Sequence, residues 1–443
     1  MINYNKISNK IKDFSLTFSK NISKKLSLPI SKSISDFIFG IIKSNSSLLS
    51  NISRALNENI KIKDTVNRLS KNLDKIYDNK NIIVSNYYNY IKQFINDDTC
   101  FHIDNSDINK DLSSKLEDLD KIKDASSKDN KTVNGYTITE IIATNSSNDL
   151  PISMYSNIFS SLSKNYKSKN DETLKAILQV SNYFGNIGTY IMDRGYDDKK
   201  YFENFNKLNL KFIIRGKSNR TVLYNNERIN ILDLSKKFKG KFNISLSMKG
   251  KTLNRYCSYT KVTIPGVTQQ IYVVFVYFKN EVAIFYTNKE LTNKEDVIQI
   301  VKKYYMRWRI EEYFKYKKQS FDFENYRVRT LKKMNALNIM ITLAISCIFC
   351  ISSNSLKMKQ SIIKFSRPIK QNVYFEYYRI TFGIYLLLSH ITKNIRDFIK
   401  KQKSPQYTQI SLFWGGLNFC GNLKRCKVLT KQKKYAKIYK MKI

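Results

Sequence analysis

Three acidic side chains are placed where carboxylates could act together in phosphodiester chemistry. Asp104 follows the apolar run Phe101–Ile103, Asp193 follows the apolar part of "GTYIMDRGYDD", and Glu311 lies in a helical segment rich in bases. Such chemistry requires that water or a 3′-hydroxyl becomes nucleophilic and that the leaving oxyanion is neutralised. Two divalent ions about 3.5–4 Å apart do both, and about three converging carboxylates hold them.

The side chains available for metal binding narrow the kind of metal. The chain has only two histidines, and its six cysteines have no zinc-site spacing. Cys347 and Cys350 form a CxxC inside an apolar run, which favours two core cysteines over a site. Any metal site would therefore use carboxylates, which favour Mg²⁺, with Mn²⁺ as a substitute. Scattered cysteines behind an N-terminus without a secretion signal predict a reduced, cytoplasmic protein.

Glu311 belongs to "YYMRWRIEEYFKYKKQ", residues 304–319. If the segment is one helix, a single arc of about 80° carries a polar stripe, formed by Tyr304, Arg307, Glu311, Lys315 and Lys318. One interpretation is a solvated face tied by i,i+4 pairs such as Glu311 with Lys315. The other is functional: Arg307 and Lys318 would hold phosphates beside the metals, and Tyr304 would bond a phosphate oxygen or stack on a nucleotide. Glu312 points about 100° away from Glu311 and is an ordinary surface or core-edge acid in this interpretation.

Composition bounds the class of protein and its partners. The 443 residues are 42% hydrophobic, which indicates a globular protein with a sizeable core. A formal charge of +41 creates a field that attracts polyanions, nucleic acid above all, although part of the lysine content resembles the imprint of an AT-rich genome. The apolar run 337–351 is too short and too interrupted to span a bilayer comfortably. It predicts a buried helix and no membrane.

Periodicity divides the chain into regions that could position these residues. Helical spacing predominates in the first region, where "KDTVNRLSKNL" resembles the recognition helix of a helix-turn-helix. Short apolar runs then alternate with helical stretches. A segment rich in strand-forming residues interrupts this alternation. The expected regions are 1–95, helical and DNA-binding; 96–217, first part of an α/β catalytic core; 218–290, β-rich insertion; 291–360, second part of the core; and 361–443, a basic helical region.

Within the core, the patterns predict strands at 135–144 and 210–217 and a helix at 171–185. Asp104 and Asp193 are then expected at the ends of two apolar strands. Active sites of α/β sheets usually lie at the carboxyl ends of their strands. The helical text at 293–319 is expected to bring Glu311 to the same place.

These residues resemble a known family. Tyr304, Arg307, Glu311 and Lys318 fit the Y-(2)-R-(3)-E-(6)-K signature of bacterial cut-and-paste transposases of the insertion-sequence-four type. "IDNSD" around Asp104 resembles the first acidic motif of that family, and "DRGYD" resembles the second. The resemblance runs from about residue 30 to residue 355, and the gap before Glu311 holds the β-rich insertion.

The resemblance implies an RNase H-like fold and an enzyme that nicks DNA at terminal inverted repeats and transfers the freed strand. It implies a DDE triad, Asp104, Asp193 and Glu311, that binds two Mg²⁺ ions. It also implies that Tyr304, Arg307 and Lys318 contact DNA, and Arg194 and Arg215 match DNA-contacting positions more loosely. The implied partner is double-stranded DNA, as transposon ends and target, bound by a synapsed homodimer. The implied location is the nucleoid of a bacterial cytoplasm.

Three alternatives remain open. Asp107 competes with Asp104 as the first acid. Some relatives use a tryptophan of the insertion to stabilise a flipped base, whereas here Tyr256, Tyr259 or Tyr272 would have to substitute, so a hairpin step is uncertain. The alternative function is a domesticated DNA-binding protein that keeps the fold but no longer cuts.

Overall fold

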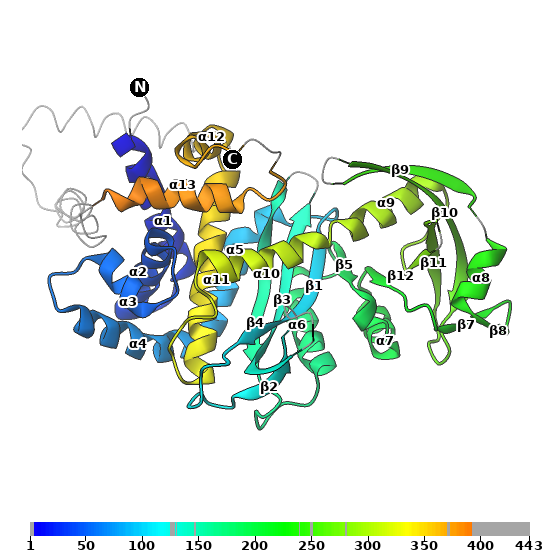
Figure 1. Ribbon diagram of the computed structural model, residues 1–443, viewed down its shortest axis with the longest axis horizontal. Helices are drawn as coiled ribbons and strands as arrows, with labels where there is room; N and C mark the ends of the chain where they lie inside the picture. Colours follow the sequence, from blue (N-terminus) through cyan, green and yellow to red (C-terminus); the bar gives the residue numbers. More distant parts are fainter. Residues whose placement is uncertain are drawn as a thin grey trace, which may run out of the picture. The chain divides into compact units, whose positions relative to one another are not determined.

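The computed structural model describes residues 4–124, 129, 131–145, 148–238, 240–248, 251–279, 281–369 and 373–391. All of these fall within one compact unit, Met1–Thr392 (Figure 1). Most of the expected C-terminal basic region, including its final lysine-rich tail, lies outside the described residues.

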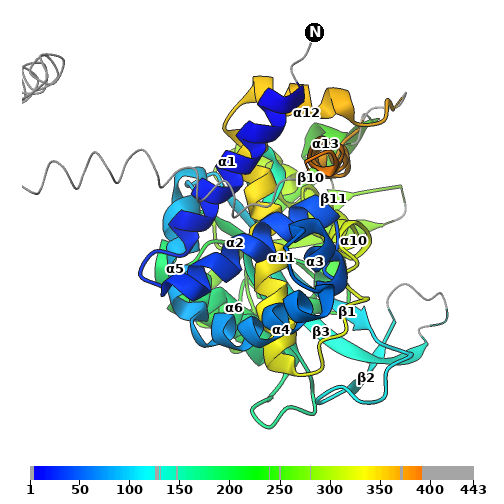
Figure 2. The ribbon, with the colours of Figure 1, turned by 90° about the vertical axis from the view of Figure 1, so that its left-hand side faces the viewer.

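The N-terminal region is helical, as predicted. Apolar residues at helical spacing give each helix a buried stripe, and the helices gather around the long helix α11 (Figure 2). Their bounds are α1 Tyr4–Ile22, α2 Leu28–Ser44, α3 Leu49–Leu56, α4 Ile62–Asp78, α5 Lys80–Ile91 and the 3-10 turn η1 Lys92–Phe94. In α4, the proposed recognition helix, Leu69 and Leu73 are buried, and Arg68 is paired internally with Asp36 and Glu58.

The core is a mixed sheet in the strand order β4-β3-β1-β5-β6. Strands β1, β3 and β4 pair antiparallel, whereas β5 and β6 run parallel to β1. This is the arrangement of an RNase H-like core, which confirms the predicted fold class. The strands are β1 Cys100–Asn109, β2 Asp120–Lys123 at the edge, β3 Thr132–Asn145, β4 Asn148–Phe159, β5 Thr189–Met192 and β6 Phe212–Arg215; the helices between them are α6 Lys169–Phe184, η2 Arg194–Tyr196 and α7 Lys199–Lys207.

The β-rich insertion continues the core sheet. Strand β12 pairs with β6, with Tyr286 opposite Ile214, so core and insertion share one twelve-stranded sheet. Strand β10 was not predicted from the sequence. The insertion comprises β7 Thr221–Tyr224, β8 Glu227–Asn230, α8 Ile231–Lys237, β9 Phe242–Met248, β10 Lys251–Thr263, β11 Gln270–Tyr277 and β12 Val282–Thr287.

The segment with helical periodicity that carries Glu311 forms two helices, α9 (Lys294–Tyr305) and α10 (Trp308–Ser320), where the sequence predicted one. The break falls at Met306 and Arg307. There the Arg307 amide bonds to the Tyr304 carbonyl at 2.9 Å, three residues back, and this tighter turn redirects the chain. Helix α9 can therefore pack on the insertion strands while α10 crosses the core strands (Figure 1).

The apolar run near residue 340 lies in α11 (Leu331–Ser353), which is followed by α12 (Leu356–Phe365) and α13 (Tyr377–Ser389). Within the described ranges, α11 is the one helix long and apolar enough to cross a membrane, and 94% of its most apolar window is buried inside the molecule. Cys347 and Cys350 are buried in it as free thiols. Helix α11 is thus the buried helix that the sequence predicted.

Candidate active site

Asp104 does not end its strand, contrary to the sequence expectation. Strand β1 continues to Asn109 along the antiparallel β3, where Asp104 lies opposite Glu140. What ends near Asp104 is the parallel pairing with β5, whose last pair is His102 with Ile191. Continuing that register places Asp104 beside Asp193, directly after β5. The two aspartates therefore meet where the parallel pair of strands separates.

The motif "DRGYDD" uses its acids in two ways, as helix caps and as a buried ion-pair partner. Asp193 accepts a hydrogen bond from the Gly195 amide at 2.7 Å, which caps η2, and Asp198 caps α7. Asp197 is fully buried, accepts from the Lys217 amide at 2.7 Å and pairs with Arg220 at 2.5 Å. Asp197 thus ties the second acidic motif to the chain that enters the insertion.

Arg307 joins two of the predicted acids. At the start of α10, its Nη1 donates to Asp104 Oδ2 at 2.9 Å, and its Nη2 pairs with Glu311 Oε1. The Arg307 and Asp104 side chains are 17% and 21% exposed, whereas Glu311 is 58% exposed. The buried end of this cluster lies on the sheet and its open end faces solvent.

Burial and charge act on this cluster together. Burial is the main cause that raises the pKa of Asp104 to about 6; Arg307 opposes the shift, and the negative charge of Asp193 adds to it. Burial by itself would lower the pKa of Arg307, but the nearby charges of Asp104, Glu311 and Asp193 raise it. All three predicted acids therefore lie within electrostatic reach of one guanidinium.

The donor set suits a hard divalent cation. Three carboxylates supply only oxygen ligands, and a single guanidinium lies within electrostatic reach of all three. Among the described residues, no three Asp, Glu, His or Cys side chains are already arranged to hold a metal ion. Instead, the Arg307 guanidinium bridges Asp104 and Glu311. These carboxylates could hold a metal only if Arg307 gave them up.

The other predicted DNA-contacting residues near this cluster differ in accessibility. Tyr304 is 7% exposed and packs on Phe285, with ring centroids 4.4 Å apart. Its hydroxyl is hydrogen-bonded to Arg215, the exposed last residue of β6. Arg194 is exposed directly after Asp193. The arginines face solvent, while Tyr304 is a packing residue beneath Arg215.

Lys318 lies in a separate ion cluster. Its Nζ is 3.2 Å from Asp107 Oδ2 and 3.1 Å from Glu324 Oε1. Asp107, the alternative first acid, is therefore paired with Lys318. Asp104 is the aspartate whose pKa is raised by the negative charge of Asp193. Lys110 anchors the same region, since it donates to the backbone oxygen of Glu324 at 2.5 Å.

Sequence reasoning missed the residue that fastens α10 to the sheet. Lys317 is fully buried and pairs with the fully buried Glu140 on β3 at 3.0 Å. Glu140 also accepts hydrogen bonds from Ser153 at 2.6 Å and Ser156 at 2.7 Å. A signal was available, because Lys317 lies seven residues after Ile310 on the apolar face of α10.

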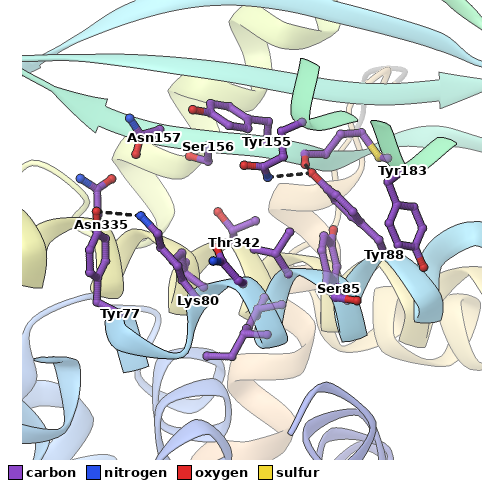
Figure 3. Close-up of a pocket in the computed structure, with 18 of the residues that line it drawn as sticks. Tyr77, Lys80, Ser85, Tyr88, Tyr155, Ser156, Asn157, Tyr183, Asn335 and Thr342 are labelled. Atoms are coloured by element: carbon purple, nitrogen blue, oxygen red, sulfur yellow. Dashed lines mark hydrogen bonds between the residues drawn. The ribbon is translucent and has the colours of Figure 1, made fainter. Parts of the chain in front are cut away.

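A cavity elsewhere offers less chemistry. It has a volume of about 370 Å³ and lies between α5 and strand β4 (Figure 3). None of its lining residues is acidic, and its polar groups partly satisfy one another: Lys80 donates to the Tyr77 hydroxyl at 3.0 Å and Gln179 to the Tyr88 hydroxyl at 3.1 Å. The acidic cluster around Arg307 is therefore the candidate active site.

Two aspartates on neighbouring parallel strands and a glutamate on a crossing helix, set on an RNase H-like sheet, define the DDE class of proteins. The chain belongs to the Transposase DDE domain family, whose model matches residues 96–347. Among solved structures, the cryo-EM structure of the piggyBac transposase synaptic complex with hairpin DNA is similar at 10% identity and a TM-score of 0.43, covering 93% of this chain and 84% of that chain. The comparison with curated proteins gave no match.

Proposed function

We propose that this protein is an active DNA transposase of the insertion-sequence-four type, which nicks and transfers strands at the terminal inverted repeats of a bacterial insertion sequence. The observation that carries the proposal is the convergence of Asp104, Asp193 and Glu311 around Arg307. A solvated helix face would not direct Arg307 into a partly buried carboxylate on the sheet. Family membership supports the reaction class.

In this proposal the three acids hold two divalent ions, Mg²⁺ or Mn²⁺. When bound, these ions supply an activated nucleophile and neutralise the leaving oxyanion. Arg307 exchanges its carboxylate partners for phosphate oxygens, since a guanidinium binds either group through paired hydrogen bonds. Arg194 and Arg215 line the exposed side for the DNA backbone, Tyr304 positions Arg215, and Lys318 contributes from its cluster with Asp107.

The proposed partner is double-stranded DNA, both as element ends and as target. The charge of +41 favours a polyanion, and membership of the Transposase DDE domain family supports DNA as that polyanion. We further propose a homodimer when two ends are synapsed, and a bacterial cytoplasmic, nucleoid-associated location.

A cleavage assay tests the proposal. Purified protein is incubated with Mg²⁺ and a labelled duplex that carries the element's own terminus, alongside the variants Asp193→Asn and Glu311→Gln. Both variants should lose cleavage and retain binding, because affinity comes chiefly from Lys and Arg contacts to phosphates. Glu312→Gln is the matched control: it removes the neighbouring charge of α10, and it should cut like the wild type.

The same assay tests the alternative function, a domesticated protein that binds DNA but no longer cuts it. If the wild type leaves the duplex uncut and all variants bind it equally, the chain binds DNA without cutting it. If Glu312→Gln loses cleavage as Glu311→Gln does, the assignment of the glutamate is wrong.

A further inference from the structure

A basic groove is lined by residues of the α3–α4 pair, of the segment that joins α10 to α11, and of the start of α11. Its volume is about 430 Å³. Three of its lining residues are basic and none is acidic. The lining residues are Leu48, Leu49, Ser50, Val66, Asn67, Ser70, Arg327, Val328, Arg329, Thr330 and Lys333. The remaining polar groups are hydroxyls and one amide, all able to donate to an anion.

The joining segment presents two arginines to solvent in a fixed way. Tyr326 and Val328 are buried, whereas Arg327 and Arg329 are exposed, which is the alternation of an extended chain. Its backbone is held on both sides. Lys110 donates to the Tyr326 carbonyl at 3.0 Å, and the Arg329 carbonyl accepts from the Glu117 amide at 3.0 Å. The two guanidinium groups therefore project from an anchored support.

The charges around the groove are unequally compensated. Lys333 pairs with Asp74 at 3.4 Å, so its charge is partly neutralised. Within the part of the chain that the structure describes, the ion pairs include no acid bound to Arg327 or Arg329. The two arginines therefore supply the excess positive charge of the groove.

The groove is connected to the candidate active site through β1. Asp104 and Asn109 lie on the same strand, and five residues of strand span about 17 Å. The Asn109 amide donates to Glu324 Oε1 at 2.9 Å, so the joining segment starts at the far end of β1. Three further residues lead to Arg327 and five to Arg329, which adds about 10–17 Å of chain path.

We propose that this groove binds the phosphate backbone of the same duplex whose reacting phosphate lies at the acidic cluster. A duplex rises about 3.4 Å per base pair, and the chain path from Asp104 to the arginines, about 27–34 Å, sets the largest separation, so the contact would fall no more than about 10 base pairs inward from the reacting end. Arginines, hydroxyls and an amide without acids suit phosphodiester oxygens, and they carry no base-specific information. The inference rests on the proposed function and adds to it a second surface, which binds the DNA at a distance from the reacting phosphate.

Fluorescence anisotropy with a 30-base-pair duplex of arbitrary sequence, at several salt concentrations, tests the groove. The variant Arg327→Ala/Arg329→Ala should bind about tenfold more weakly at low salt, and the slope of log affinity against log salt should fall by about 2. Lys357→Ala/Lys364→Ala removes the same charge from exposed positions of α12 and should keep the wild-type slope. Arg327→Lys/Arg329→Lys retains the charge and should recover most of the slope. Thermal unfolding checks that each variant is folded.

Three results would overturn the inference in distinguishable ways. If the wild type binds the duplex steeply with salt and the double-alanine variant matches the α12 control, the groove does not hold DNA, while the proposed function stands. If the wild type shows no salt-dependent binding, the proposed function falls and the groove with it. A variant that loses only self-association in sedimentation would make the groove a protein interface instead.

Discussion

Burial shifts two neighbouring groups of β1 in opposite directions. It raises the pKa of Asp104 to about 6, because a carboxylate loses its hydration. It lowers the pKa of His102 to about 3, and the positive charges of Arg309 and Arg307 add to that effect. His102 is fully buried and shares a 2.8 Å hydrogen bond with Thr144. The strand next to the acids therefore carries a neutral histidine at physiological pH.

His102 should make the fold sensitive to acid. Its ordinary pKa in an unfolded chain is about 6.5, so between pH 6.5 and 3 the unfolded state binds more protons and stability falls as pH falls. Between pH 6.5 and 5 the loss from this residue is about 2 kcal/mol. Asp104 titrates in the same range with the opposite sign, because its pKa is raised in the folded state. The informative quantity is therefore the difference between wild type and His102→Leu.

Urea unfolding at pH 6.5 and pH 5, with chelator present, measures that difference. The variant should lose about 2 kcal/mol less than the wild type over this interval. Equal losses would mean that His102 is protonated or solvated in the folded protein. His390, the other histidine, is exposed at the end of α13 and serves as the control position.

The sequence located individual residues better than it located their partners. The acids and Arg307 were singled out by their positions at strand ends or on a helix stripe and by their resemblance to family motifs. In the structure Arg307 pairs with Asp104 and Glu311, and the charge of Asp193 acts on Arg307 and Asp104. The partners of Lys318 were not predicted, because Asp107 and Glu324 come from another strand and from a loop. Ion pairs across such sequence distances depend on the folded chain path, which local periodicity does not report.

At the scale of elements, the position of α10 depends on two cation–carboxylate contacts with neighbouring strands. Arg307 reaches Asp104 on β1, and Lys317 reaches Glu140 on β3, directly opposite Asp104. Burial lowers the pKa of Lys317, while the charge of Glu140 raises it. The buried pair thus fixes the helix that carries Glu311.

Removing one partner of the buried pair should be costly. Lys317→Met leaves Glu140 uncompensated in the core and should destabilise the protein by about 3–5 kcal/mol. The double variant Lys317→Met/Glu140→Gln removes both charges and should recover a large part of that loss. Chemical denaturation of the two single variants and the double variant gives the coupling energy. Additive losses would show that the contact contributes nothing specific.

The sequence predicted several elements of the core but missed others, among them strands β2, β4 and β10 and the break between α9 and α10. Strand β3 and helix α6 were expected from clear periodicity, and both form. Strand β10 was missed because "KTLNRYCSYTKVT" has no apolar run; pairing with β9 and β11 makes it a strand. The break at Met306 was missed because no proline or glycine marks it, and the amphipathic pattern continues across it.

At the scale of the whole molecule, charge dominates behaviour in solution. A formal charge of +41 makes the chain repel itself, which destabilises the compact state. Added salt screens this repulsion over about 10 Å at 0.1 M. The same screening weakens attraction to a polyanion.

Salt should therefore affect stability and DNA binding in opposite directions. Raising NaCl from 50 to 300 mM should raise the thermal midpoint by a few degrees and reduce affinity for duplex DNA by orders of magnitude. Scanning fluorimetry and anisotropy on one preparation measure both. A neutral osmolyte at matched osmolality is the control for general solvent effects. A midpoint that falls with salt would mean that internal ion pairs outweigh the net repulsion.

The arrangement of the whole sheet could be predicted only in part. An α/β core with a β-rich insertion follows from the order of patterns along the chain. That β12 extends the core sheet through β6 does not, because strand pairing between distant segments leaves no local signal.

The bridge formed by Arg307 has a consequence for the protein at rest. Carboxylates gathered at one spot normally repel each other until an ion from solution arrives. Here Arg307, a side chain of the same polypeptide, offsets part of the charge of Asp104 and Glu311, so the fold can persist in metal-poor surroundings. Chelation should therefore leave the unfolding temperature unchanged, because the contacts of Arg307 with Asp104 and Glu311 need no metal ion.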